Sequence, residues 1–303
     1  MKKIIIVGLG NMGVAHLNSF INNKIQAELY LVEKRISRHE NIKKILLKKK
    51  VKNFYLLKKS PKNKLFHFAI IATKPKDRLK AIKKLTNNNK IRFLFLEKFL
   101  FNELIQYKKF NKINRKKVIK TFVNIWSNLF LNSVGIKRNK KKFLIKVFLP
   151  ENKMLTNLIH FYEIFRILAG RKFKIDFSNF TLEKKRDYYD GIGKIKLRNK
   201  KGSEMTIESK RIKDTFIFLY KSKKVEKNLQ FLKGKMVYLN KKNRKKINFP
   251  LASITTCRLY KSLIFKDKSR KNIRFPKYSV IERNSKTILR SLFSHYKKKI
   301  RIN

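Results

Sequence analysis

The sequence feature that most constrains the fold is a glycine-rich turn that follows an apolar run near the start of the chain. Residues 4–7 read Ile-Ile-Ile-Val, and residues 8–13 read Gly-Leu-Gly-Asn-Met-Gly. At a strand–turn–helix junction, the first glycine permits a tight turn, the second lets the backbone approach a pyrophosphate, and the third lets the helix pack on the strand. The motif therefore predicts a phosphate site at a helix N-terminus. Its expected residues are Gly8, Gly10, Asn11, Met12 and Gly13.

The residues after the motif favour a dinucleotide. A helical stretch reaches about Asn23, and a second strand, 28–32, ends at Glu33, twenty residues after Gly13. An acidic side chain at that place can accept hydrogen bonds from the adenosine ribose. Glu33 favours NAD because it would repel a 2′-phosphate, whereas Lys34 and Arg35 would attract one, so NADP stays open. The alternative is a glycine turn in another kind of βαβ unit.

Basic residues far outnumber acidic ones. The chain of 303 residues has 80 Lys and Arg against 18 Asp and Glu, a formal net charge of +62. Such a charge is typical of proteins that bind nucleic acid or anionic membranes. Here the basic residues are spread over every segment, and lysine is accompanied by abundant Asn, Ile and Phe, as A/T-rich codons would produce. We interpret the charge as mainly compositional and expect no specific nucleic-acid partner; a nucleic-acid binder is the alternative that charge alone suggests.

The sequence also bears on compartment and metal content. Cys257 is the single cysteine, so no intrachain disulfide forms, and no metal-ligand spacing exists. The first residues superficially resemble a signal peptide, but the glycine motif lies inside the apolar stretch and Asn11 interrupts it. No run approaches the roughly 20 apolar residues of a membrane helix. We expect a cytoplasmic protein that neither inserts into membranes nor binds a metal.

Strands and helices alternate over the first part of the chain. Strands are predicted at 54–56, 66–73 and 91–96, and a helix at 76–86. Nearly continuous apolar strands are typical of a parallel sheet covered by helices on both faces. Residues 1–119 are therefore predicted to form a doubly wound Rossmann domain. Ligands of such sheets bind at the carboxyl ends of the strands. The residues at these ends are Ala72, Thr73, Lys74, Glu97 and Lys98.

Residues 120–303 are predicted to form an α+β domain with an open, mainly antiparallel sheet. An apolar helix is expected over 154–168, ended by Gly170, and 199–202 reads as a hairpin turn. The predicted strands are 118–123, 143–148, 177–182, 187–197, 204–209, 215–220 and 235–239, and the last helices lie near 251–265 and 284–299. The lysine-rich stretches 106–120 and 240–246 are interpreted as solvated connectors.

These features together resemble the Gfo/Idh/MocA family of NAD(P)-dependent sugar oxidoreductases over nearly the whole chain. His16 follows the last glycine by three residues, as in the family's extended motif, and Glu97-Lys98 matches its Glu-Lys-Pro signature, with Phe99 for proline. Residues 157–163 resemble its His-x-x-Asp helix, with Glu for Asp. Residues 123–126 resemble a family strand that usually carries Asn and Arg, and 249–256 the stretch before the penultimate helix. The resemblance also implies a homo-oligomer formed through the open sheet.

The activity that the resemblance implies is hydride transfer between a nicotinamide and a sugar or nucleotide-sugar, for instance in surface-polysaccharide biosynthesis. Oxidising a hydroxyl also needs a base for its proton. His160 is expected to be that base, and Lys98 to stabilise the alkoxide or relay the proton. Asn124, Trp126 and Asn157 are expected to contact the substrate beside His160. The alternatives are that Lys98 is an ordinary surface lysine, that His160 is a hydrogen-bonded histidine within an apolar helix, and that Trp126 is a core residue.

Two departures from the family pattern suggest a second function. An acidic residue usually precedes the family histidine by four positions, where this chain has Thr156. The family proline is associated with a cis peptide bond, which costs a non-proline residue ~2.5–4 kcal/mol. Either Phe99 is trans and Lys98 is displaced, or the local fold absorbs that cost. The alternative function is a catalytically inactive dinucleotide-binding regulator or scaffold.

Overall fold

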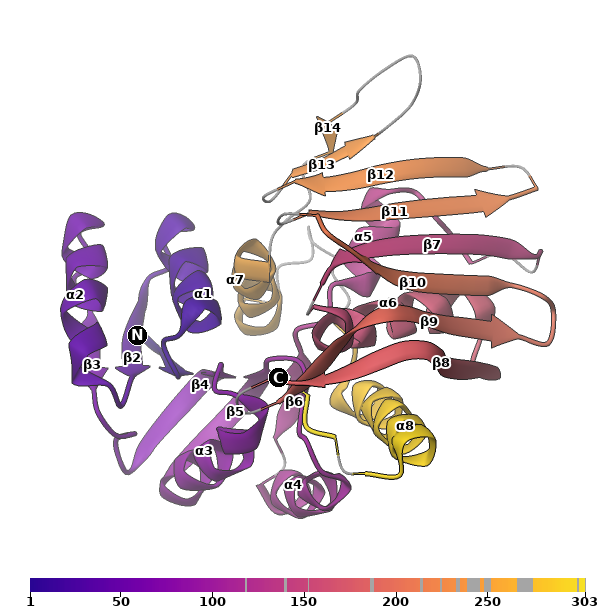
Figure 1. The fold of residues 1–303 in the computed structure, drawn as a ribbon. Coiled ribbons are helices and arrows are strands. Elements are labelled where there is room, and N and C mark those ends of the chain that lie inside the picture. Colours follow the sequence, from indigo (N-terminus) through magenta and orange to yellow (C-terminus); the bar gives the residue numbers. More distant parts are fainter. Residues whose placement is uncertain are drawn as a thin grey trace. The chain divides into compact units, whose positions relative to one another are not determined.

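The computed structural model describes residues 1–117, 119–138, 141–151, 153–185, 188–212, 215–223, 225–232, 235–238, 246–247, 252–265, 275–298 and 300–302. The chain forms two compact units (Figure 1). One contains residues 1–124 with 251–282, and the other contains 125–250 with 283–303. Positions 118, 187, 239–245, 249–251 and 299 of the expected elements lie outside the described residues.

The first unit contains a six-stranded parallel sheet with the strand order β3-β2-β1-β4-β5-β6. Its strands are β1 Lys2–Val7, β2 Ala27–Val32, β3 Phe54–Leu57, β4 Lys64–Ile71, β5 Asn89–Leu96 and β6 Lys120–Val123. Its helices are α1 Asn11–Asn22, η1 Ile36–Arg38, α2 His39–Lys48, α3 Pro75–Asn88, α4 Leu104–Lys117 and α7 Ala252–Ile264. Ile4, Ile5 and Ile6 are successive residues of β1 with no exposed surface, as expected where helices cover both faces. The predicted doubly wound sheet is confirmed.

Helix α7 packs in this first unit, whereas the sequence alone placed it with the second domain. The ring of Tyr260 lies 5.5 Å from that of Phe20 on α1 and 5.6 Å from that of Phe68 on β4. The backbone N–H of Cys257 donates to Ser19 Oγ at 3.1 Å. A helix that returns from far along the chain finds its partner through the shape of the apolar surfaces, which the order of elements does not reveal.

The second unit contains an eight-stranded sheet with the order β14-β13-β12-β11-β7-β10-β9-β8. Only the β7–β10 pairing is parallel among the pairings of its described strands, so the expected mainly antiparallel sheet is confirmed. The strands are β7 Phe143–Pro150, β8 Phe173–Lys184, β9 Tyr189–Asn199, β10 Glu204–Lys210, β11 Thr215–Ser222, β12 Glu226–Leu232, β13 Lys235–Tyr238 and β14 Lys246–Ile247. The remaining helices are α5 Ser127–Ser133, α6 Met154–Ala169 and α8 Tyr278–Tyr296, of which residues 278–282 belong to the first unit. As predicted, Gly170 ends α6, with φ of +91°, and 199–202 turns β9 into β10.

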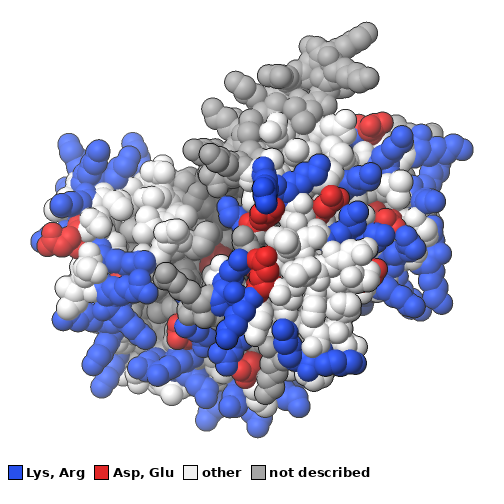
Figure 2. All heavy atoms as spheres, viewed as in Figure 1, with Lys and Arg blue, Asp and Glu red and all other residues white. Residues whose placement is uncertain are grey.

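The prediction of a connector at 106–120 is wrong, because most of this stretch forms α4. Tyr107 and Phe110 have no exposed surface, and their rings lie 5.1 and 5.5 Å from that of Phe101. Two aromatic anchors three residues apart suffice to dock a helix whose other face is basic. Helix α5 and strand β12 were not among the predicted elements. Lys and Arg are spread over the visible face of the molecule with Asp and Glu among them (Figure 2). Within the described ranges, no helix combines the length and apolarity needed to cross a bilayer.

Candidate functional site

The glycine turn joins β1 to α1 with a backbone that side chains would obstruct. Gly8 has φ of +89°, and a Cβ added there would lie 3.0 Å from Thr73 Cγ2. A Cβ on Gly13 would lie 1.9 Å from the carbonyl oxygen of Gly8. Gly10 is the N-cap of α1, and Asn11 and Met12 form its exposed first turn. The turn therefore offers bare backbone at a helix N-terminus, which is the geometry that binds a phosphate.

Glu33 follows β2 and is bound to the glycine turn. Its Oε2 accepts the N–H of Leu9 at 2.9 Å, and its Oε1 accepts the N–H of Arg35 at 3.1 Å. The residue is only 7% exposed. The guanidinium of Arg38 lies 3.9 Å from Oε2, whereas Lys34 and Arg35 are exposed. No motif in the sequence predicted Arg38, whose side chain the short helix η1 brings back to the turn.

The segment between β4 and α3 lies beside the glycine turn. The N–H of Ala72 donates to Val7 O at 2.9 Å, which extends the pairing of β1 with β4 to the carboxyl edge. Thr73 Oγ1 is buried and has no hydrogen-bond partner among the described residues. Lys74 is exposed at the N-terminus of α3. The three predicted residues thus lie at the expected edge of the sheet.

Glu97 is the centre of a buried polar cluster. Its Oε1 lies 2.6 Å from His16 Nε2 and accepts Asn124 Nδ2 at 2.6 Å. His16 Nδ1 in turn lies 2.7 Å from Thr256 Oγ1 on α7. Burial raises the pKa of Glu97, but the hydrogen bond and charge of His16, the Asn124 amide and the charge of Arg78 together hold that pKa below its ordinary value. Glu97 is therefore a carboxylate at neutral pH.

We expect Glu97→Gln to destabilise the protein in a pH-dependent way. The carboxylate has a lower pKa in the folded state than the ordinary ~4.3, so its stabilisation is present above that value and is lost as pH falls through the folded-state pKa. At pH 7 the variant should be less stable by about 1.5–3 kcal/mol, since hydrogen bonds to a charged group are lost. Thermal unfolding of both proteins from pH 7 to pH 3 measures the difference, which should close at the acid end. A pH-independent gap, or the same gap for the exposed control Glu40→Gln, would contradict this role.

Residues 97–102, which follow β5 and are called the corner below, are buried except for Lys98. From residue 93 to residue 102, every residue except Lys98 is buried. The Lys98–Phe99 peptide bond is cis, the second of the two arrangements left open by the sequence. Arg78 of α3 binds carbonyl oxygens on both sides of Lys98 and was not among the predicted site residues. A buried arginine in a helix with Leu79, Ile82 and Leu85 on its apolar face carries no local signal that sets it apart from the exposed cations.

In the second unit, His160 is held against Trp126. The two rings stack with centroids 4.4 Å apart at 25°, and Trp126 also lies 5.8 Å from Phe216 at 17°. His160 is 2% exposed, and its carbonyl oxygen accepts Ser127 Oγ at 2.7 Å. The structure thus brings two of the predicted residues together. Contact of either one with a substrate stays a prediction.

The start of α6 is bound to a buried carboxylate from β9. Asp190 Oδ1 accepts the N–H of Leu155 at 2.8 Å, and its Oδ2 accepts Thr156 Oγ1 at 2.9 Å. Burial raises the pKa of Asp190 more than these hydrogen bonds lower it. The hydrogen bond to Thr156 thus places the Asp190 carboxyl group beside the position where the family pattern has an acid. Asn157 Nδ2 donates to Lys153 O at 2.9 Å in an exposed setting.

The predicted site residues fall into two groups, one in each unit. The first unit holds Gly8, Gly10, Asn11, Met12, Gly13, Glu33, Lys34, Arg35, Ala72, Thr73, Lys74, Glu97, Lys98 and Asn124; the second holds Trp126, Asn157 and His160. The convergence of Lys98 with His160 stays a prediction.

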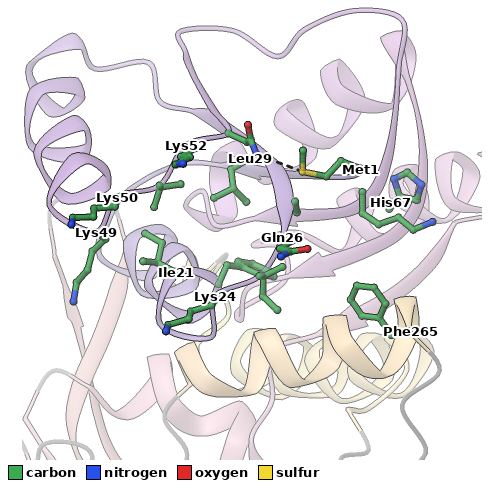
Figure 3. Close-up of a pocket in the computed structure, with 16 residues that line it drawn as sticks. Met1, Ile21, Lys24, Gln26, Leu29, Lys49, Lys50, Lys52, His67 and Phe265 are labelled. Carbon is green, nitrogen blue, oxygen red and sulfur yellow. Dashed lines mark hydrogen bonds between the residues drawn. The ribbon is translucent and has the colours of Figure 1, made fainter.

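A separate cavity of about 930 Å³ lies at the opposite, amino-terminal edge of the parallel sheet (Figure 3). None of the predicted site residues lines it. Lys24 and Lys50, which do, have φ of +48° and +52°, and their N–H groups donate to Ile21 O and Leu47 O. These lysines thus cap the C-termini of α1 and α2, where the helix dipole attracts cations. Their presence is explained without an anionic ligand, so we place no site there.

Comparisons with protein-family models and with curated proteins found no match. Solved structures do match. A dehydrogenase from Clostridium difficile has a TM-score of 0.66 at 12% identity, over 97% of this chain and 99% of that one. A putative NADPH-dependent oxidoreductase from Desulfitobacterium hafniense has 0.65 at 9%, over 99% and 97%. An oxidoreductase from Agrobacterium radiobacter, in complex with NAD+, L-tartaric acid and magnesium, has 0.60 at 11%, over 94% and 93%. At these identities the likeness establishes that this chain shares their fold.

Proposed function

We propose that this chain is an NAD(P)-dependent oxidoreductase of the Gfo/Idh/MocA family that transfers a hydride between a nicotinamide and a sugar or nucleotide-sugar. The observation that carries the proposal is the carboxyl edge of the parallel sheet. A bare glycine turn lies there beside a buried corner from which only Lys98 emerges. Structures of the same fold include one described as NADPH-dependent and one in complex with NAD+.

The residues at this edge fit a dinucleotide. At Gly10, the N-cap of α1, the nearest atom to an added Cβ is Arg38 Nη1 at 3.5 Å, so a pyrophosphate would have access to the first N–H groups of the helix. Thr73 Oγ1, which has no protein partner among the described residues, can bond to the coenzyme. Glu33 lies at the end of β2, where ribose hydroxyls are bound. We propose NAD as the coenzyme; NADP is the alternative, with Arg38 rather than Lys34 or Arg35 as the nearest cation to Glu33.

The bound nicotinamide would accept or supply the hydride, and the side chains of the chain would handle the proton. Lys98 would donate a hydrogen bond to the reacting oxygen and stabilise negative charge that develops on it. His160, whose ring orientation is fixed by stacking on Trp126, would take or return the hydroxyl proton. Asn124 and Asn157 would orient substrate hydroxyls. Asn124 Oδ1 is buried without a partner among the described residues, which supports a polar ligand near it.

A second candidate function is a catalytically inactive dinucleotide-binding regulator or scaffold. Thr156 favours it, because this residue replaces the family acid and its hydroxyl is already bonded to Asp190. Coenzyme binding without turnover on a broad sugar panel would support this candidate.

The decisive experiment measures coenzyme binding and turnover in the purified protein. We expect NADH to bind, with a change in its fluorescence, and an absorbance change at 340 nm with at least one sugar or nucleotide-sugar. Failure of both NADH and NADPH to bind would overturn the proposed function. The same preparation tests two further proposals, a homo-oligomer and the absence of a specific nucleic-acid partner. A monomer in light scattering would contradict the first, and DNA binding that survives ~0.15 M salt would contradict the second.

A further inference from the structure

Arg78 differs from the other cations of this chain. Among the described residues, it is the only Lys or Arg that is buried, with 1% of its surface exposed. A guanidinium in the interior is unfavourable unless it is paired or hydrogen-bonded. Specific hydrogen bonds must therefore stabilise Arg78 inside the first unit, and the groups that accept them indicate its role.

The guanidinium binds four backbone carbonyl oxygens. Nη1 lies 2.5 Å from Glu97 O and 3.0 Å from Leu100 O and also contacts Phe99 O, so one of its two N–H groups is shared between two of these oxygens. Nη2 donates to Thr73 O at 2.6 Å. Three of these oxygens belong to residues 97–100, on both sides of Lys98. The fourth belongs to the residue beside the glycine turn. One planar side chain thus connects the end of β4 to the corner that follows β5.

The charge at this place is balanced. Burial lowers the pKa of Arg78 to about 10, and the charge of Glu97 opposes that shift, so the guanidinium stays protonated at neutral pH. The Glu97 carboxylate is itself held by His16 and Asn124. Glu97, the residue before Lys98, is therefore fixed at two points: Arg78 binds its carbonyl oxygen, and His16 and Asn124 bind its carboxylate.

We propose that Arg78 is a positioning residue for Lys98: by binding the carbonyl oxygens of Glu97, Phe99 and Leu100, it sets the direction in which the Lys98 ammonium leaves the corner. A fork of fixed N–H groups suits several carbonyls at once, which a lysine ammonium on a flexible stem does not. This inference rests on the proposed function for its catalytic meaning, since Lys98 is the group to be positioned beside the substrate.

The first test separates positioning from stability. Arg78→Gln should lower kcat by about 10–100-fold, while KM and the Kd for NADH change less than about 3-fold, because only the reacting group is displaced. Arg78→Lys, which keeps the charge, should recover part of kcat. Lys80→Gln, an exposed change on the same helix, is the control. A folded Arg78→Gln protein with wild-type kcat would overturn the inference, and if this variant does not fold, the Arg78→Lys protein decides on the same criterion.

A second test needs neither a substrate nor a coenzyme. Amine-specific labelling of the whole protein, followed by peptide mass spectrometry, measures the labelling rate of each lysine as a function of pH. In Arg78→Lys the pH profile at Lys98 should shift, whereas the profiles at Lys80 and Lys90 should not. An unchanged profile at Lys98 would overturn the inference even if the protein proves to be a dehydrogenase. If no coenzyme binds but the profile shifts, the proposed function fails and the positioning role stands.

Discussion

Gly13→Ala abolishes coenzyme binding and lowers the Tm, whereas Gly10→Ala abolishes binding at an almost unchanged Tm. A Cβ at residue 13 would lie 1.9 Å from Gly8 O and 2.9 Å from Gly8 C, both backbone atoms that move only if the whole turn moves. Such overpacking costs about 1–3 kcal/mol or more. At residue 10 the nearest atom is Arg38 Nη1, at 3.5 Å, on a flexible side chain. The Gly10 backbone has φ of −69°, which alanine adopts without strain.

The two variants act as controls for each other. Differential scanning fluorimetry gives the Tm, and titration with NADH gives the Kd. We expect the Kd to rise at least ~100-fold in both proteins. The Cβ at residue 10 keeps the pyrophosphate away from the backbone, and the Cβ at residue 13 displaces the turn that binds it. If a folded Gly10→Ala protein binds NADH with the wild-type Kd, the glycine turn is not the phosphate site. A wild-type Tm for Gly13→Ala would contradict the close contact between residue 13 and the carbonyl oxygen of Gly8.

Lys98→Met and His160→Gln each lower turnover by about 100-fold or more, while NADH binding is retained. Loss of a group that stabilises a developing oxyanion costs about 2.7–4 kcal/mol in the barrier, and loss of a general base has a comparable effect. The fold should survive, because Lys98 is not buried and glutamine keeps most of the volume of His160.

Steady-state kinetics at 340 nm measure these effects, with Lys90→Met, an exposed change at the start of the strand β5 that leads to Lys98, as the control. The two proteins should also differ from each other in their pH–rate profiles, since the acid limb that a histidine base produces should disappear only in His160→Gln. Near-wild-type turnover in either variant would remove that residue from the mechanism. An equal loss of turnover in the Lys90→Met control would show that the loss of any positive charge, rather than of Lys98 itself, lowers turnover.

Local patterns in the sequence were enough to predict the framework of the site. The glycine turn follows an apolar strand, and β4 and β5 end at Ile71 and Leu96, close to where their apolar runs end. These elements could be predicted because burial on both faces, glycine geometry and helix periodicity each depend on neighbouring residues. The helix α4 was missed because its two aromatic anchors, Tyr107 and Phe110, stand among lysines that dominate the local composition.

The sequence by itself determined most of the strands and helices, though not α4, α5 or β12. It also determined that a bare glycine turn and the end of β5 share one edge of a parallel sheet. Only the tertiary structure decided which partners the polar side chains find. It placed α7 against α1, paired Glu97 with His16 and Asn124, and set Asp190 beside Thr156. It also selected Arg78 as the buried cation. The physical reason is that these contacts join residues distant in the sequence, and the packing of whole elements, rather than any local periodicity, decides which of many similar side chains is enclosed.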